Sequence, residues 1–243
     1  YVEGKGVVVR EPSVVAVDKN TGKIIQVGAA ARNMLGRTPG NVVAMHPLKE
    51  GVISDHSMTV RLLTALFRRA GQKSLLSKPR VIICVPSGVT EVQERTVINA
   101  AIEAGARRVF LIEEPLAAGL GAGLDIKGAK GHLVVDIGGG STEILAGADG
   151  HVLGGGSAQM GAVRLTARCP EGTPREELIA EAKRVLQPVY ELASGVPVDV
   201  WVGVGGTATT LAAMDMRMTE YDAGRIQDHA ITRDFVSGLL DRL

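Results

Sequence analysis

The sequence predicts an α/β fold built around parallel strands, and three observations support this class. Short apolar runs, typical of buried strands, alternate with segments of helical periodicity. Several of these runs end in glycine-rich turns, and the chain holds 31 glycines among 243 residues. Hydrophobic residues make up 45% of the chain but aromatic residues only 3%, so the core is expected to be aliphatic.

Local signals define the expected elements of the first half. A hairpin signal at Asn20-Thr21-Gly22 precedes a strand, and Ser54 is expected to cap a helix that runs to about residue 70. Cys84 lies in an apolar run typical of a strand covered on both faces, which predicts a buried thiol. The other expected elements are strands at Ile24–Val27, Arg80–Val85 and 109–112, a short helix at 29–35, and a helix from a Thr90-Gln93 capping box to near Gly105.

The second half repeats this architecture without repeating its sequence. Pro115 suits the first turn of a helix of small residues, and Asp149-Gly150 is a second hairpin signal. Thr173 with the following Pro-Arg-Glu is a helix start, and Thr232 caps the last helix. Buried strands are expected at 133–137 and Val200–Val204, and another strand is expected at 142–145.

Composition excludes several classes of protein. The formal net charge is +1, which argues against a nucleic-acid platform or an anionic-membrane platform. Two distant cysteines make neither a disulfide framework nor a zinc cluster, and a reducing cytoplasm is the expected compartment. No apolar run reaches ~18 residues. The five histidines show no metal-ligand spacing.

The strongest chemical motif follows the apolar run at 133–137. Asp136 ends this strand, and three glycines, Ser141 and Thr142 follow it. Glycine backbone approaches an anion closely, and a carboxylate at a strand end can hold Mg²⁺ through water. The alternative interpretation is a plain glycine hairpin in which the aspartate caps its own turn.

Two further motifs lie where strands meet helices. Glu113 and Glu114 precede Pro115 at the carboxyl edge of the expected sheet, where an acid can orient or deprotonate a water. Both acids can also simply complement the helix dipole, and this is the favoured interpretation for Glu113. The turn at Gly205-Gly206-Thr207 can bring a helix N-terminus toward a nucleoside, although many α/β strands end in glycine.

These motifs, in this order, resemble the actin, sugar-kinase and heat-shock-chaperone ATPase superfamily. Residues 1 to about 130 are similar to MreB, the bacterial actin homologue. The resemblance rests on residues 4–16, 36–41, 51–55 and 110–115. Residues from about 131 are more similar to the Ppx/GppA exopolyphosphatase family, through 136–143, 160–166 and 203–212.

The resemblance implies a fold and a role for each motif residue. It implies an actin-like, ribonuclease-H-like two-domain ATPase fold that clamps a nucleotide, with domain I at 1–130 and domain II at 131–243. Glu114 would position the hydrolytic water, and Asp136 would hold Mg²⁺ through water. The implied nucleotide-binding residues are Gly138, Gly139, Gly140, Ser141, Thr142, Gly205, Gly206 and Thr207.

The resemblance leaves three functional hypotheses open. The first is ATP binding and hydrolysis of the MreB type, with self-association into filaments or dimers and a role in cell shape. The second is a phosphohydrolase acting on polyphosphate or guanosine pentaphosphate, and the third is a non-catalytic nucleotide-binding scaffold. Relative to both families, the chain is expected to begin after the first strand and its phosphate loop. It is also expected to lack a membrane-binding terminus and to bind no nucleic acid.

Overall fold

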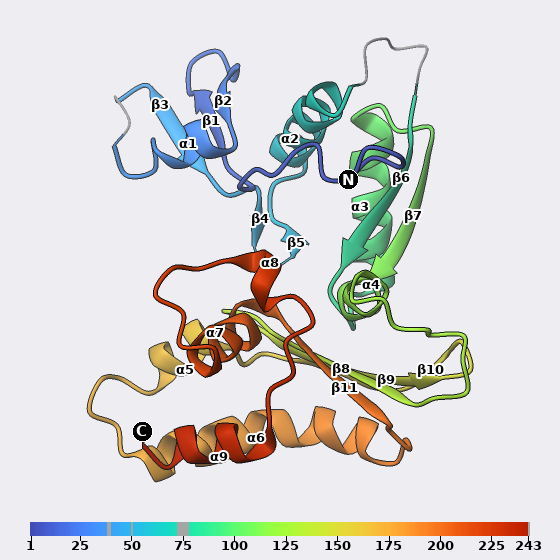
Figure 1. Ribbon diagram of the computed structural model, residues 1–243. Coiled ribbons are helices and arrows are strands. Elements are labelled where there is room, and N and C mark those ends of the chain that lie inside the picture. Colours follow the sequence, from blue (N-terminus) through green and yellow to red (C-terminus); the bar gives the residue numbers. More distant parts are fainter. Residues whose placement is uncertain (38–39, 50, 72–77, 243) are drawn as a thin grey trace. The chain divides into compact units, whose positions relative to one another are not determined.

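The computed structural model describes residues 1–243 except 38–39, 50, 72–77 and 243. It separates into two compact units (Figure 1). The first holds Tyr1–Val85 and Val89–Ile112, and the second holds Pro86–Gly88 and Glu113–Leu243. The second unit therefore includes the segment from Glu113 to residue 130. The domain boundary near residue 130 stays a prediction.

The first unit is built on three small sheets, with strand orders β2-β1-β3, β4-β5 and β6-β7. The expected hairpin at Asn20-Thr21-Gly22 is confirmed, because β1 and β2 pair antiparallel across it. The elements are β1 (Val15–Asp18), β2 (Ile24–Val27), α1 (Ala29–Arg32), β3 (Val42–Met45), β4 (Leu48–Lys49), β5 (Val52–Ile53), α2 (His56–Arg69), β6 (Arg80–Val85), α3 (Glu91–Glu103) and β7 (Arg108–Glu113).

The second unit is built on one sheet with strand order β10-β9-β8-β11. Strand β8 is central, and it pairs antiparallel with β9 and parallel with β11. The elements are α4 (Glu114–Gly121), β8 (His132–Ile137), β9 (Thr142–Ala148), β10 (His151–Ala158), α5 (Ala162–Arg168), α6 (Arg175–Ser194), β11 (Val200–Val204), α7 (Gly205–Asp215), α8 (Ala223–Ile226) and α9 (Arg233–Leu240).

The core of the second unit lies between its sheet and α6. Leu133 of β8 and Ile144 of β9 are buried against Val189 and Ala193 of α6. Figure 1 shows α6 running across one face of the sheet. Because Asp136 follows Leu133 by three residues along β8, it points to the opposite face, away from this core. The core therefore fixes the strand that carries the acid without covering the acid itself.

Two of the expected helix caps are confirmed and two are wrong. Thr90 forms its capping box, and Thr232 accepts from the N–H of Phe235. Helix α2 is capped by Asp55, because Ser54 donates its hydroxyl proton to the Pro47 carbonyl. The hydroxyl of Thr173 likewise donates to the Pro170 carbonyl, and α6 begins at Arg175 without a side-chain cap.

The prediction that Cys84 is buried is also wrong. Burial along β6 alternates, and the Ile82 side chain is 69% exposed. Cys84 lies on the same open face and is exposed. An apolar run does not by itself distinguish a strand covered on both faces from one covered on a single face, because that depends on what packs against it.

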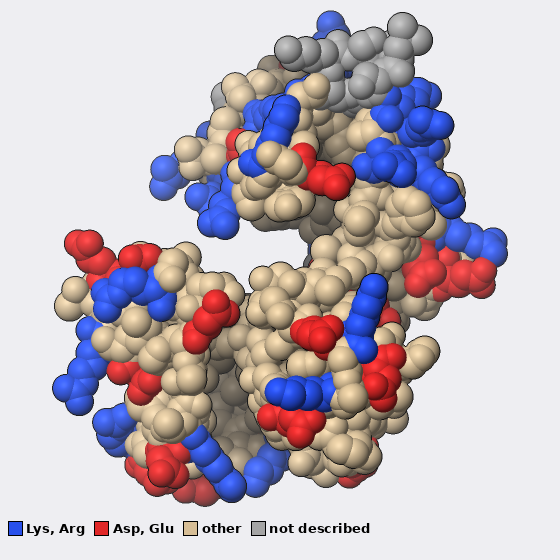
Figure 2. Space-filling model, turned by 45° about the vertical axis from the view of Figure 1, so that its right-hand side comes forward, with Lys and Arg blue, Asp and Glu red and all other residues tan. Residues whose placement is uncertain are grey.

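Charge is distributed without a dominant sign on the visible face of the second unit, the lower part of Figure 2, where acidic and basic side chains are interspersed. This distribution agrees with the net charge of +1. Among the helices that the structure describes, none has the length and apolar character needed to cross a membrane.

Candidate functional site: an acidic cluster beside two glycine turns

The step from β7 into α4 separates the roles of two neighbouring acids. Glu113 lies at the N-cap of α4, and its carboxylate accepts a 2.6 Å hydrogen bond from the hydroxyl of Ser87, which is buried. Glu114 is the first residue of the helix and is followed by Pro115. Glu113 is therefore held by a structural partner, which agrees with the structural interpretation favoured for it from the sequence.

Strands β8 and β9 bring a second pair of acids together. Asp136 and Glu143 are directly opposite each other in the antiparallel register. Opposite residues point to the same face of a sheet, with Cβ atoms about 4.5–5.5 Å apart. Glu143 is only 2% exposed, and its Oε1 accepts from the Ser157 hydroxyl at 3.4 Å. Its Oε2 is buried and has no hydrogen-bond partner among the described residues.

Electrostatics connects the three acids Glu114, Asp136 and Glu143. Burial raises the pKa of Glu114 above its usual value, and the charge of Asp136 raises it further. Burial also raises the pKa of Asp136. The pKa of Glu143 rises to about 7, first through burial and then through the charges of Glu114 and Asp136. The three carboxyls therefore lie close enough to repel one another, and we call them the acidic cluster.

The glycine turn between β8 and β9 is fixed through its carbonyl groups. The N–H of Gly138 donates to the Ser141 carbonyl at 3.0 Å and closes the turn. The carbonyls of Gly138 and Gly139 accept from Ala162 and Val163 in the first turn of α5, at 3.2 and 2.9 Å. The N-terminus of α5 is therefore used to hold the turn and is not available to an anion.

This arrangement leaves other N–H groups of the turn available. Among the described residues, no acceptor is paired with the N–H groups of Gly139 and Gly140. Thr142 is buried, and its hydroxyl donates to the Met160 carbonyl at 2.7 Å. The hydroxyl proton of Thr142 thus has a structural partner, and the backbone of the turn is the better candidate for binding an anion.

The glycine turn after β11, Gly205-Gly206-Thr207, lies beside Asp136 of the acidic cluster. Strand β11 pairs in parallel with β8, with Val204 beside Asp136, so Gly205 begins α7 next to that carboxylate. Gly205 has φ +84°, and a Cβ at this position would lie 2.4 Å from Asp136 Oδ1 and 2.7 Å from the Ile137 carbonyl oxygen. Only glycine fits here, and both glycine turns converge on one aspartate.

The cluster offers carboxylate and backbone groups but no cage of side chains for a metal. Among the described residues, no group of three or more His, Cys, Asp or Glu side chains is placed to hold a metal ion. Carboxylate oxygens suit a hard cation, and Mg²⁺ usually keeps several waters and binds through one or two carboxylates. The unpaired oxygen of Glu143 and the raised pKa values fit a site that gains from a nearby cation.

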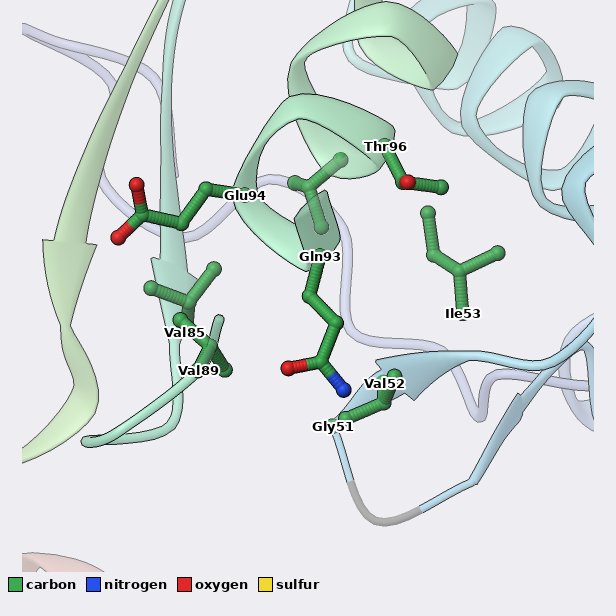
Figure 3. Close-up of a pocket in the computed structure, with 9 residues that line it drawn as sticks. Gly51, Val52, Ile53, Val85, Val89, Gln93, Glu94 and Thr96 are labelled. Carbon is green, nitrogen blue, oxygen red and sulfur yellow. The ribbon is translucent and has the colours of Figure 1, made fainter. Parts of the chain in front are cut away.

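A small pocket in the first unit is a weaker candidate for a functional site than the acidic cluster. It measures about 50 Å³ and lies between β5 and α3 (Figure 3). The Gln93 side chain extends toward Gly51 and Val52 in this view, but its carbonyl already accepts from Thr90 in the capping box. The Thr96 hydroxyl donates to a carbonyl of its own helix. The side-chain carbonyl of Gln93 and the hydroxyl of Thr96 are thus already paired.

Glu143 was not predicted as a site residue from the sequence, although it belongs to the motif that begins at Asp136. A usable signal was its spacing. With a tight turn after residue 137, strand pairing places Glu143 opposite Asp136, and alternation then directs both carboxyls to one face. Its burial and the proximity of Glu114 could not be read from spacing, because they depend on how α4 packs.

The fold and the acidic cluster together define an actin-like α/β protein, and solved structures support this class. The chain superimposes on crystal structures described as MreB5 of Spiroplasma citri bound to AMPPNP and bound to ADP, each with a TM-score of 0.61 and 34% identity. The matches cover 75% of this chain and 54% and 53% of those chains.

Sequence relatives then identify the family. The chain is 48% identical over 160 residues to the cell shape-determining protein Mbl of Bacillus cereus and 48% identical over 149 residues to MreB of Escherichia coli K12. These matches cover 66% and 59% of this chain but 48% and 43% of the relatives, so the chain spans about half their length. The MreB/Mbl family model matches residues 1–164, and the Ppx/GppA phosphatase family model matches residues 113–243. The chain belongs to the MreB/Mbl family and, through its second half, also to the Ppx/GppA family.

The two family matches overlap on residues 113–164. All three members of the acidic cluster, Glu114, Asp136 and Glu143, lie within this overlap, as does the glycine turn after β8. Gly205-Gly206-Thr207 falls within the Ppx/GppA match alone. The resemblance read from the sequence, with an MreB-like first part and a Ppx/GppA-like second part, is confirmed.

Proposed function

We propose that the second unit binds ATP with Mg²⁺ at the acidic cluster and that the chain serves an MreB-type role in cell shape. Self-association and a cytoplasmic location are part of this proposal. The family assignment supports it, as do the names of the curated relatives, which are cell shape-determining proteins. The structural neighbours crystallised with AMPPNP and ADP support the ligand class.

One observation carries the proposal: the buried carboxyl of Glu143 and the half-buried carboxyls of Glu114 and Asp136 meet beside two glycine turns in one compact unit. Burying like charges is costly unless a cation or a proton compensates them. A nucleotide with its divalent cation supplies positive charge to the carboxyls and phosphate oxygens to the free N–H groups of Gly139 and Gly140. A simple structural hairpin needs neither Glu114 nor Glu143.

Each residue has a defined task in this mechanism. Asp136 would hold Mg²⁺ through water, and the cation would neutralise phosphate charge. The N–H groups of Gly139 and Gly140 face the phosphate oxygens. The N-terminus of α7, beginning at Gly205, faces the nucleoside side. Glu114, with its raised pKa, orients the attacking water and accepts its proton.

The first experiment measures binding and hydrolysis separately. Millimolar ATP with Mg²⁺ should raise the melting temperature of the chain above that with Mg²⁺ alone, because a ligand that binds the folded state stabilises it. Replacing the proposed base, Glu114→Gln, should retain this shift and reduce ATP hydrolysis by about 10²-fold or more. Glu171→Gln, at an exposed position outside the site, is the control. No melting shift in the wild type would refute nucleotide binding. A melting shift without ATP hydrolysis in the wild type would favour the scaffold hypothesis, and unchanged hydrolysis in E114Q would show that Glu114 is not the base.

The Ppx/GppA match supports a second candidate, hydrolysis of polyphosphate or guanosine pentaphosphate, because it includes every residue of the acidic cluster and both glycine turns. The MreB-type function ranks first because the MreB/Mbl match is longer and the structural neighbours are MreB proteins. ATP-dependent pelleting and phosphate release from polyphosphate distinguish the two. Polyphosphate cleavage without pelleting would reverse their order.

A further inference from the structure

A second pocket in the second unit lies apart from the acidic cluster. It measures about 90 Å³ and lies where α4 covers the start of β8. Its lining is mostly apolar and includes Pro115 and Gly119 of α4, Val134 of β8 and Leu145 of β9. In the part of the chain that the structure describes, no Asp, Glu, Lys or Arg lines it.

Two histidines interrupt this apolar lining: the exposed His151, at the start of β10, and His132, at the first position of β8. The His132 side chain is buried, with 9% exposure, and both ring nitrogens are shielded from solvent. Among the described residues, none is a hydrogen-bond partner of either nitrogen. A neutral imidazole carries one donor and one acceptor, and leaving both unpaired in the interior is unfavourable. A buried polar group of this kind calls for an explanation, and the pocket that it lines provides one.

The pocket and the acidic cluster lie on the same face of β8. His132, Val134 and Asp136 are two residues apart in turn, so their side chains point to one side of the sheet. Four residues of strand separate His132 from Asp136 by about 13 Å. Helix α4 connects the two places, since Glu114 at its start lies near Asp136, and a Cβ on Gly119 would lie 3.2 Å from Val134 Cγ2.

We propose that this pocket binds a small neutral molecule that has a compact aliphatic body and one hydroxyl group, with His132 as the hydrogen-bonding partner of the hydroxyl. Among the described residues, no Asp, Glu, Lys or Arg side chain lines the pocket, and this favours a neutral ligand, because an ion would be desolvated without a counter-charge. A cavity of about 150 Å³ is known to hold benzene. The smaller volume here suits a branched alkyl group of about four carbons.

The test compares two probes of the same shape. 2-Methylpropan-1-ol carries the hydroxyl, and 2-methylbutane replaces it with a methyl group. Titrations of the isotope-labelled full chain, followed by NMR of the His132 ring and the backbone amides, give both affinities. We expect saturable shifts at His132 and Val134, and at least tenfold tighter binding of the alcohol. The amide of Glu114 should also shift, because the next residue, Pro115, lines the pocket.

Replacing the imidazole should reverse this preference. In His132→Leu the alkane should bind at least as tightly as the alcohol, whereas His46→Leu, at an exposed histidine of the first unit, should retain the wild-type preference. Equal affinity of the wild type for both probes, or no saturable shift, would overturn the proposal. The proposal would also be overturned if the His132 ring were hydrogen-bonded to a trapped water that the alcohol does not displace. The wild-type comparison decides the outcome even if His132→Leu does not fold, and it does not depend on whether the acidic cluster binds ATP.

Discussion

The two ends of β8 bury polar groups in different ways. At its carboxyl end, Asp136 shares its surroundings with two other carboxyls, and the pKa of Glu143 rises to about 7. At its amino end, His132 is buried among apolar side chains without a hydrogen-bond partner among the described residues. Asp136 and His132 point to the same side of the same strand. The contrast therefore arises from what the neighbouring elements place around each end.

The comparison shows that burial has different consequences for charged and neutral groups. Like carboxyls raise one another's pKa values, and a cation or a proton relieves the repulsion. The buried imidazole of His132 lacks hydrogen bonds to the described residues, and a hydroxyl group can supply them. Under our two proposals, one end of β8 binds a polyanion with its cation and the other binds an uncharged molecule. Three substitutions test this contrast.

The largest effect on stability is expected at Glu143. Its pKa rises from the usual 4.5 to about 7, so between these values the folded chain retains a proton that the unfolded chain has lost. Stability should therefore fall as pH rises from about 4.5 to about 7, by roughly 3 kcal/mol. Glu143→Gln should remove most of this slope and be more stable than the wild type at pH 8. Urea unfolding across pH measures it, with Glu171→Gln as the control. An unchanged slope in E143Q would contradict the raised pKa.

An intermediate effect is expected at Gly205. Alanine there would adopt a φ of +84° and place its Cβ against Asp136 Oδ1. Gly205→Ala should cost about 2 kcal/mol of stability. It should also weaken ATP binding through displacement of Asp136. The adjacent Gly206→Ala is the matched control, because a Cβ at Gly206 meets nothing within 4 Å. Equal unfolding free energies for the two variants would show that the close approach to Asp136 is not required.

The smallest effect is expected at His132. Leucine fills similar space and removes two unpaired polar atoms, so His132→Leu should stabilise the chain by about 1 kcal/mol. This corresponds to a melting temperature about 2–4 °C higher. Thermal unfolding in the absence of any additive measures it, with His46→Leu as the control. A lower melting temperature would mean that the imidazole has a partner in solution, and the contrast between the two ends of β8 would then disappear.

Much of the fold could be predicted from local signals. The capping box at Thr90, the cap at Thr232 and the strand at Val200–Val204 depend on residues close in sequence, and all three elements are confirmed. The expected burial of this strand is wrong, because Trp201 is 66% exposed. Helix α2 is capped by Asp55 and not by Ser54, because the Ser54 hydroxyl donates to the Pro47 carbonyl, seven residues earlier in the chain. The burial of Cys84 was mispredicted for a similar reason, because it depends on which elements cover β6.

The class of fold, both glycine turns and the acids Glu114 and Asp136 could be predicted from the sequence, because each is encoded in a short run of residues with a distinct pattern. Packing in three dimensions was needed to show that Glu143 joins those acids, that Thr142 gives its hydroxyl proton to the Met160 carbonyl, and that His132 is buried beside a pocket. Burial and charge coupling are properties of groups brought together by packing. Burial and charge coupling cannot be predicted from a local sequence pattern, because the strand register and the position of α4 must be known first.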